Sequence, residues 1–304
     1  MTTTRAWLQI HFCVVLWGCT AVLGKLISLK ALPLVWWRMV LVAAALLFVR
    51  RFWSGLAGMT PRQTAIFAGT GVFVAAHWLT FYGAIKLANA SVAATCMALI
   101  PVFMSFTEPL VTRRRFELAE LLFGLACVPG VMLVVGGTPS QMHLGVAVGA
   151  ASAFFAAVFG SLNKRYIASH DVLAVTGVEM TAGALLLTLA APLAPDDLPV
   201  FVLPSGRDAL LLLFLAFGCT LLPFALSLAT MRRLSAFSIA LAINMEPVYA
   251  ITLATLLLGE QHELSPSFYA GVAILLLIVF SHPWISQRTA RARLTAANVD
   301  SAVD

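Results

Sequence analysis

A single glutamate and a following proline stand inside a long apolar stretch near the end of the chain. Glu246 is followed directly by Pro247, which has no backbone N–H and leaves a helix carbonyl without its usual donor. A carboxyl group in apolar surroundings is costly unless it finds a partner. We therefore expect Glu246 to face an interior cavity, where it could attract a substrate amine or exchange a proton. The alternative is that it caps a neighbouring helix or bonds to a polar side chain.

Aromatic residues at helical spacing provide the second candidate feature. His77 and Phe81 share one helix face, and Trp78 and Tyr82 share the adjacent face. Such rings usually pack in a core or face lipid, but the polar atoms of Trp and Tyr need hydrogen-bond partners at mid-depth. We expect these four residues, together with Trp17 in the first apolar stretch, to contact a substrate.

The remaining polar residues inside apolar stretches are assigned more ordinary roles. Arg38 and Glu179 have opposite charges, but their expected depths differ by about 10 Å at 1.5 Å per helical residue, which argues against a pair. Arg38 is expected to extend outward or to bind helix-end carbonyls. Thr220 and Asn244 could add hydrogen bonds to a substrate, with packing between helices as the alternative.

The elements that must position these residues follow from composition. Hydrophobic residues make up 61% of the 304 positions and charged residues only 11%. The mean hydropathy is +0.95. Soluble domains carry roughly 25% charged residues, so lipid must be the solvent for much of this chain.

Several function classes are excluded by the absence of their motifs. The five cysteines lie in apolar stretches without C-x-x-C spacing, which argues against a metal site. No H-E-x-x-H, G-x-S-x-G or G-x-x-x-x-G-K-[ST] motif is present, so neither an enzyme nor a nucleotide-driven pump within this chain is indicated. The net charge of +6 comes from short basic clusters without interleaved aromatics, which does not indicate nucleic-acid binding. No cofactor is expected.

Ten apolar segments are long enough to span a bilayer as helices, which takes about 20 residues each. They run at about 7–28, 33–50, 63–87, 90–111, 119–136, 144–166, 172–192, 208–231, 235–258 and 266–285. Residues 286–304 form a polar tail. Most of the 19 Lys and Arg residues fall on alternate connections, and basic loops stay in the cytoplasm. We predict a multi-pass protein of the bacterial inner membrane with both termini in the cytoplasm.

The chain also repeats itself. Residues 90–118 and 236–264 align with an offset of 146 and pair Pro101 with Pro247. Each half holds five expected spans, and an odd number requires the halves to enter the membrane in opposite orientations. Inverted repeats are typical of secondary transporters, whose site lies between the halves near mid-membrane. Matched prolines could serve as hinges for alternating access.

The sequence resembles the drug/metabolite transporter superfamily, in its ten-helix branch of two EamA-type halves. The features that carry the resemblance are Trp17-Gly18 with Lys25, Trp37-Arg38, Ala84-Ile85-Lys86, Pro101-Val102-Phe103, Glu246-Pro247-Val248-Tyr249-Ala250 and Leu258-Gly259-Glu260. Within that branch the chain is most similar to the YddG-like exporters of aromatic and other amino acids. One departure is Arg113-Arg114, where the pattern of the family has Gly-Glu.

The resemblance implies an all-α integral membrane protein, with two inverted five-helix repeats around a central cavity. The first half would span residues 1–139 and the second residues 140–285. The implied function is export of amino acids, aromatic and other apolar or small ones, by alternating access. The alternative is an exporter of aromatic cations or drugs coupled to proton exchange. The expected partners are a small-molecule substrate and the lipid bilayer, with a monomer sufficient to enclose the pathway.

Overall fold

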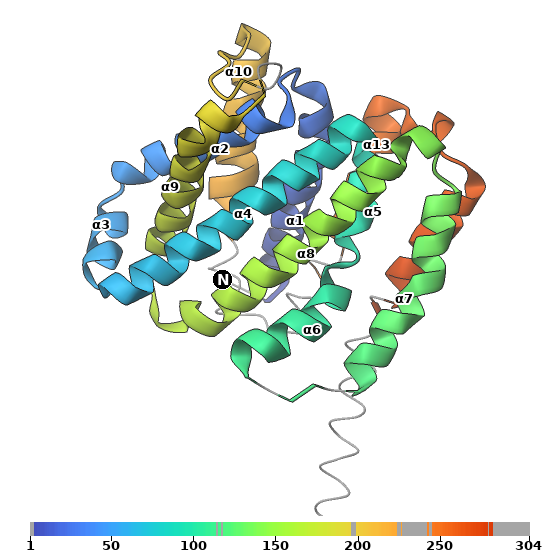
Figure 1. Ribbon diagram of the computed structural model, residues 1–304, viewed down its shortest axis with the longest axis horizontal. Coiled ribbons are helices and arrows are strands. Elements are labelled where there is room, and N and C mark those ends of the chain that lie inside the picture. The colour runs from blue at the N-terminus through green and yellow to red at the C-terminus, as the bar shows by residue number, and fades with distance from the viewer. Residues whose placement is uncertain are drawn as a thin grey trace, which may run out of the picture.

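The computed structural model describes residues 3–113, 115–116, 118–195, 199–223, 226, 242, 245–278 and 280–281. Every regular element among them is helical, and the long helices lie side by side in one bundle (Figure 1). Helical structure satisfies the backbone N–H and C=O groups within each segment, which a bilayer interior requires. The all-helical expectation is confirmed for this part of the chain.

In the first half of the chain, the described residues form seven helices. They are α1 (Thr3–Leu26), α2 (Ala31–Leu47), α3 (Arg50–Ala57), α4 (Pro61–Leu87), α5 (Ala90–Met97), α6 (Ile100–Thr112) and α7 (Leu118–Gly136). The second half contains α8 (His143–Tyr166), α9 (Val172–Ala190), α10 (Gly206–Leu213), the π-helix η4 (Phe214–Leu221), α13 (Glu246–Leu258) and a helix at Pro266–Ile278. Short 3₁₀ turns lie at Ser140–Met142, Ile167–Ser169, Ala191–Leu193 and Glu260–His262.

Among the described residues, five helical stretches are long and apolar enough to cross a membrane: α1, α4, α5 with α6, α8 and α9. The bent pair of α2 and α3 gives a sixth if it counts as one span. The three expected spans at 208–231, 235–258 and 266–285 lie partly outside the described residues. The count of ten spans therefore stays a prediction.

The start of α4 shows how local sequence sets a helix boundary. Thr60 accepts a hydrogen bond from the backbone of Gln63, whose side chain accepts from the backbone N–H of Thr60. This capping box satisfies two of the otherwise unpaired groups at the helix end, and Pro61 fits the first turn because it needs no donor.

Two boundaries differ from the expected spans. The span expected at 33–50 ends at Leu47, and the chain turns by 87° into α3, with Val49 in extended conformation. The bend places the charged Arg50 and Arg51 at the surface, and Arg51 pairs with Asp171 at the start of α9. The segment expected at 90–111 is helical on both sides of a short irregularity at Ala98 and Leu99.

Helices α6 and α13 correspond closely. Both contain thirteen residues, their bounds differ by the same offset of 146, and both have proline in the first turn. Each ends at a left-handed residue, Arg113 at φ 59° and Gly259 at φ 70°. The prolines Pro101 and Pro247 thus lie in the first turn after an irregular residue rather than in the middle of a continuous helix.

Packing centres on α4, which lies against α8 and α9, while α13 lies against α1 and α6 against α8 (Figure 1). Small residues permit these close approaches. A Cβ atom at Gly71 of α4 would lie 2.3 Å from the carbonyl oxygen of Glu179 in α9. Large apolar side chains such as Leu125, Leu189 and Leu256 are exposed on the outside of the bundle, where lipid would cover them.

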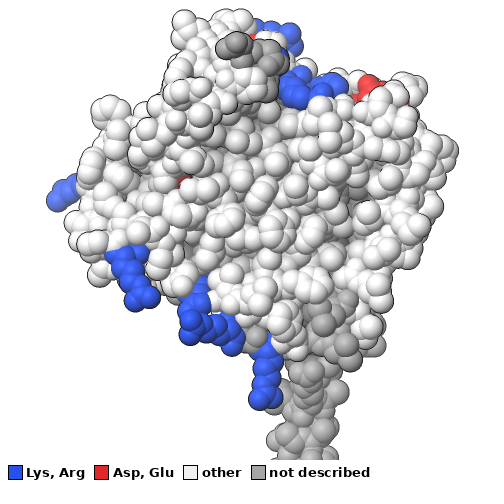
Figure 2. Space-filling model, viewed as in Figure 1, with Lys and Arg blue, Asp and Glu red and all other residues white. Residues whose placement is uncertain are grey.

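Charged side chains gather at the two ends of the bundle. On the face seen in Figure 2, Lys and Arg line the lower edge, a smaller group of both signs lies at the top, and the wide middle is almost free of charge. This distribution fits a slab of hydrocarbon around the middle of the molecule.

The close approach of α4 and α9 gives a stability test with a matched control on the same helix. Gly71→Ala should lower the free energy of unfolding by about 1–3 kcal/mol because the new methyl group meets backbone atoms that cannot yield. Gly69→Ala, where a Cβ meets nothing within 4 Å, should leave stability unchanged or slightly higher. The apparent melting temperature in detergent measures both. Equal melting temperatures for the two variants would refute this packing.

The left-handed residue at the end of α6 gives a second test. Arg113→Gly should raise stability by about 1 kcal/mol because glycine adopts positive φ without the steric penalty of a side chain. Gly259→Ala, at the corresponding position after α13, should lower it by a similar amount. Chemical unfolding of the purified variants measures both changes, and a loss of stability in Arg113→Gly would contradict the assignment.

Candidate functional site

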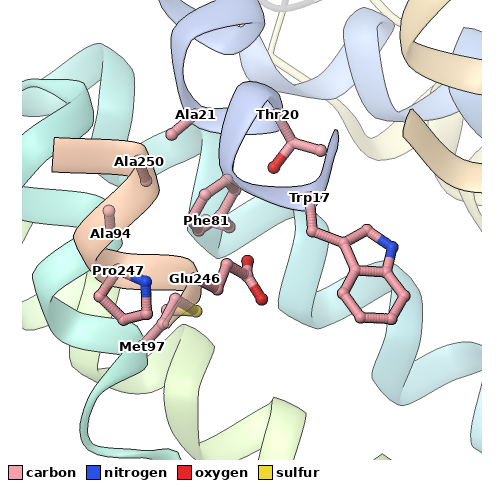
Figure 3. Close-up of a pocket in the computed structure, with 9 residues that line it drawn as sticks. All are labelled: Trp17, Thr20, Ala21, Phe81, Ala94, Met97, Glu246, Pro247 and Ala250. Carbon is pink, nitrogen blue, oxygen red and sulfur yellow. The ribbon is translucent and has the colours of Figure 1, made fainter. Parts of the chain in front are cut away.

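A narrow pocket lies in the bundle interior where α1, α4, α5 and α13 meet (Figure 3). Its lining residues are Trp17, Thr20, Ala21, Phe81, Ala94, Met97, Glu246, Pro247 and Ala250. Eight of these nine residues are uncharged, and in this conformation the walls leave no room for even a water molecule. The pocket is therefore a mostly apolar, contracted space with one ionisable group.

Glu246 supplies that ionisable group. It is the first residue of α13 rather than a residue halfway along a helix, as the sequence alone had indicated. In Figure 3 its carboxyl group points into the space bounded by Trp17 and Phe81. The N-terminus of a helix carries partial positive charge and favours an anionic side chain there. The expectation that Glu246 faces the bundle interior agrees with this placement.

Trp17 and Phe81 reach the pocket from two different helices. Trp17 and Thr20 lie one turn apart on α1, and Gly18 lets α1 approach α13 until a Cβ would lie 3.1 Å from the Ala250 nitrogen. Phe81 comes from α4. Two of the aromatic residues singled out in the sequence therefore do lie beside Glu246.

Arg38 does not extend outward as expected. Its side chain is buried, Nε donates to Thr220 Oγ1 at 2.9 Å, and Nη1 donates to Tyr82 Oη at 2.8 Å. The guanidinium carbon lies 3.6 Å from the centre of the Trp78 ring, which is close enough for a cation–π interaction. The partners that hold Arg38 come from α4 and η4, and these contacts between helices cannot be read from the position of Arg38 within its own segment.

Thr220 is positioned by the π-helix η4. Its hydroxyl donates to the Leu215 carbonyl at 2.8 Å and accepts from Arg38. A π-turn shifts side chains relative to a regular helix and often lies at a functional site. Here it presents the Thr220 oxygen to the guanidinium of a different helix.

Trp78 and Tyr82 thus contact Arg38 from the face of α4 adjacent to Phe81. The Tyr82 ring is fully buried, and a Cβ at Gly24 of α1 would lie 2.6 Å from it. One turn of α4 therefore connects the surroundings of Arg38 with the pocket of Glu246. The sequence indicated these aromatic residues but missed the cation that they surround.

His77 makes contacts that favour a role in packing between helices over contact with a substrate. Its Nδ1 lies 2.8 Å from Ser152 Oγ and 3.0 Å from the Ser152 carbonyl, and the Ser152 hydroxyl donates to the His77 carbonyl. These bonds join α4 to α8. The ring also lies near Phe159 and Phe81. Asn244, the remaining predicted contact, lies outside the described residues.

Arg38 and Glu246 are connected through α4, because Arg38 bonds to Tyr82 and the preceding residue, Phe81, lines the pocket of Glu246. Among the residues that the structure describes, they form no direct ion pair, and neither do Arg38 and Glu179. The interior thus holds a guanidinium from α2 and a carboxyl group from α13 that are not joined directly. All five cysteines are free and buried or partly buried.

The chain matches one protein family and resembles a solved structure. The profile of the EamA-like transporter family matches two stretches, residues 5–136 and 143–282. A solved structure described only as "Crystal structure of protein" matches with a TM-score of 0.59 at 18% identity, over 93% of this chain and 99% of that one. At that identity the likeness shows the fold alone. No curated protein matches the chain.

The family profile covers nearly all of the described helices, and its members are transporters rather than enzymes. A mostly apolar helical bundle with an interior pocket is consistent with that assignment. The chain belongs to the EamA-like transporter family.

Proposed function

We propose that this transporter exports amino acids, aromatic and other apolar or small ones, by alternating access in the manner of the YddG-like exporters. The observation that carries the proposal is the position of Glu246 in a pocket walled by Trp17, Phe81 and Met97. A carboxylate can hold an ammonium group, while the rings and the thioether contact an apolar side chain. A sugar nucleotide or phosphate would require paired basic residues that the pocket lining lacks.

The proposed architecture has ten spans in two inverted halves, residues 1–139 and 140–285. The correspondence of α6 and α13 in length, in first-turn proline and in left-handed end residue supports it. The family profile also matches one stretch in each half. Five spans per half would turn the second half upside down relative to the first.

The proposed site lies where the two halves meet. Trp17 and Phe81 belong to the first half, and Glu246 belongs to the second. Pro101 and Pro247 each follow an irregular residue, and they act as hinges in the proposed cycle. The other assigned contacts are His77, Trp78, Tyr82, Thr220 and Asn244.

The proposed location is the bacterial inner membrane, with both termini in the cytoplasm. Basic clusters at Arg50-Arg51 and Lys164-Arg165 support this orientation because cytoplasmic loops are rich in Lys and Arg. A monomer suffices, because the pocket is enclosed by helices of one chain.

The proposal predicts saturable flux of at least one amino acid in proteoliposomes loaded with a panel of radiolabelled amino acids. Glu246→Gln should reduce that flux about tenfold or more, because a charge-assisted bond contributes roughly 1.5–3 kcal/mol. Glu263→Gln is the matched control: its exposed side chain lies outside the pocket, and the bond to Asn89 can persist. Absence of flux for every amino acid in the panel would overturn the proposal.

Growth of expressing cells separates amino-acid export from export of aromatic cations. Expression should protect cells against a toxic amino-acid analogue and should not protect them against a cationic dye. The physical reason is that Arg38 bonds to Tyr82, the residue after Phe81 of the pocket lining, and a positive charge there disfavours a solute with positive charge alone. Protection against the dye but not against the analogue would favour the other substrate class.

A further inference from the structure

The two interior charges described above come from opposite halves of the chain. We propose that Arg38 binds the carboxylate of the transported solute while Glu246 holds its ammonium group, so that the transporter selects zwitterions. This inference rests on the proposed amino-acid transport and adds Arg38 as the residue that determines specificity.

Arg38 is held by two hydrogen bonds and one aromatic ring. Nε donates to Thr220, Nη1 donates to Tyr82, and the guanidinium carbon lies 3.6 Å from the centre of the Trp78 ring. A guanidinium has five N–H donors, and these two bonds occupy two of them. Neither partner is an acid. The cation is therefore oriented by neutral groups, with its charge available to an anionic ligand in the bidentate geometry that Arg favours.

The charge of the buried Arg38 side chain also favours an anionic ligand beside it. A buried cation in a bilayer interior is expensive unless a counter-charge compensates it. Among the described residues, Arg38 forms no ion pair with an acidic side chain. A solute carboxylate beside Arg38 would supply the missing close counter-charge. A solute ammonium beside Glu246 would do the same at the other end.

The surroundings of Arg38 and of Glu246 share one helix, α4. Helix α4 places Tyr82 against Arg38 and the preceding residue, Phe81, in the pocket of Glu246. The ammonium and carboxylate of an α-amino acid are attached to one carbon atom. A single solute that engages both charges must therefore draw Glu246 of α13 toward Arg38 of α2. Occupancy would then pull the two halves together, which is the coupling that alternating access requires.

This inference can be tested first on the unaltered protein. The probes are the amino acid with the largest flux in the panel, its decarboxylated amine and its carboxyl amide, each offered as a competitor of labelled amino-acid flux in proteoliposomes. The amine and the amide should compete at least about tenfold more weakly than the unlabelled amino acid, because each lacks the carboxylate that Arg38 binds. Equal competition by all three compounds would overturn the inference.

Variants of Arg38 locate the effect. Arg38→Gln should reduce amino-acid flux about tenfold or more while the flux of the decarboxylated amine changes by less than about twofold, because only the carboxylate contact is lost. Arg38→Lys should restore part of the amino-acid flux, since it keeps the charge but not the planar fork. Arg62→Gln, at an exposed position at the start of α4, is the control for loss of a positive charge.

The outcomes separate this inference from the proposed function. If no amino acid is transported by the unaltered protein, the proposed function fails. If amino acids are transported but the ratio of amino-acid to amine flux is the same in Arg38→Gln and the unaltered protein, only the assignment of Arg38 fails. If Arg38→Gln does not fold, the competition measurement on the unaltered protein decides.

Discussion

The cost of placing charge inside hydrocarbon is the constraint on which the rest of this structure depends. A guanidinium at the depth of Arg38 must exchange its water for protein groups, and it finds a hydroxyl from η4, a phenol and an indole face from α4. These contacts fix how α2, α4 and the π-helix pack together. Tyr82 also follows Phe81 of the Glu246 pocket, so that one packing arrangement joins the surroundings of Arg38 to the proposed site.

Much of the fold could be predicted because the lipid environment simplifies the problem. Apolar length indicates helices, and turn residues such as Thr60-Pro61 end them, which is why α4 begins within two residues of its expected position. The offset of 146 found in the sequence reappears in the bounds of α6 and α13. The 87° turn between α2 and α3 was not predicted, because it depends on contacts such as Arg51 with Asp171 that lie far apart in sequence.

The candidate site was predicted in part. Glu246, Trp17 and Phe81 were identified because polar or aromatic residues deep in apolar segments need partners, and the structure places all three at one pocket. Arg38 was misassigned because its partners lie on α4 and η4, and the register of those helices against α2 cannot be read from the sequence. The pairing of His77 with Ser152 could not be foreseen either, because it depends on the register between α4 and α8.

The central claim is that the pocket beside Glu246 opens in turn to each side of the membrane and receives the solute. Chemical labelling of Thr20→Cys, in a protein whose five native cysteines are replaced, tests it most directly because Thr20 lines that pocket. Membrane-impermeant thiol reagents should modify the new cysteine from either face of oriented vesicles, and a transported amino acid should slow the reaction. No modification from either face, or the same rate with and without the amino acid, would contradict the account.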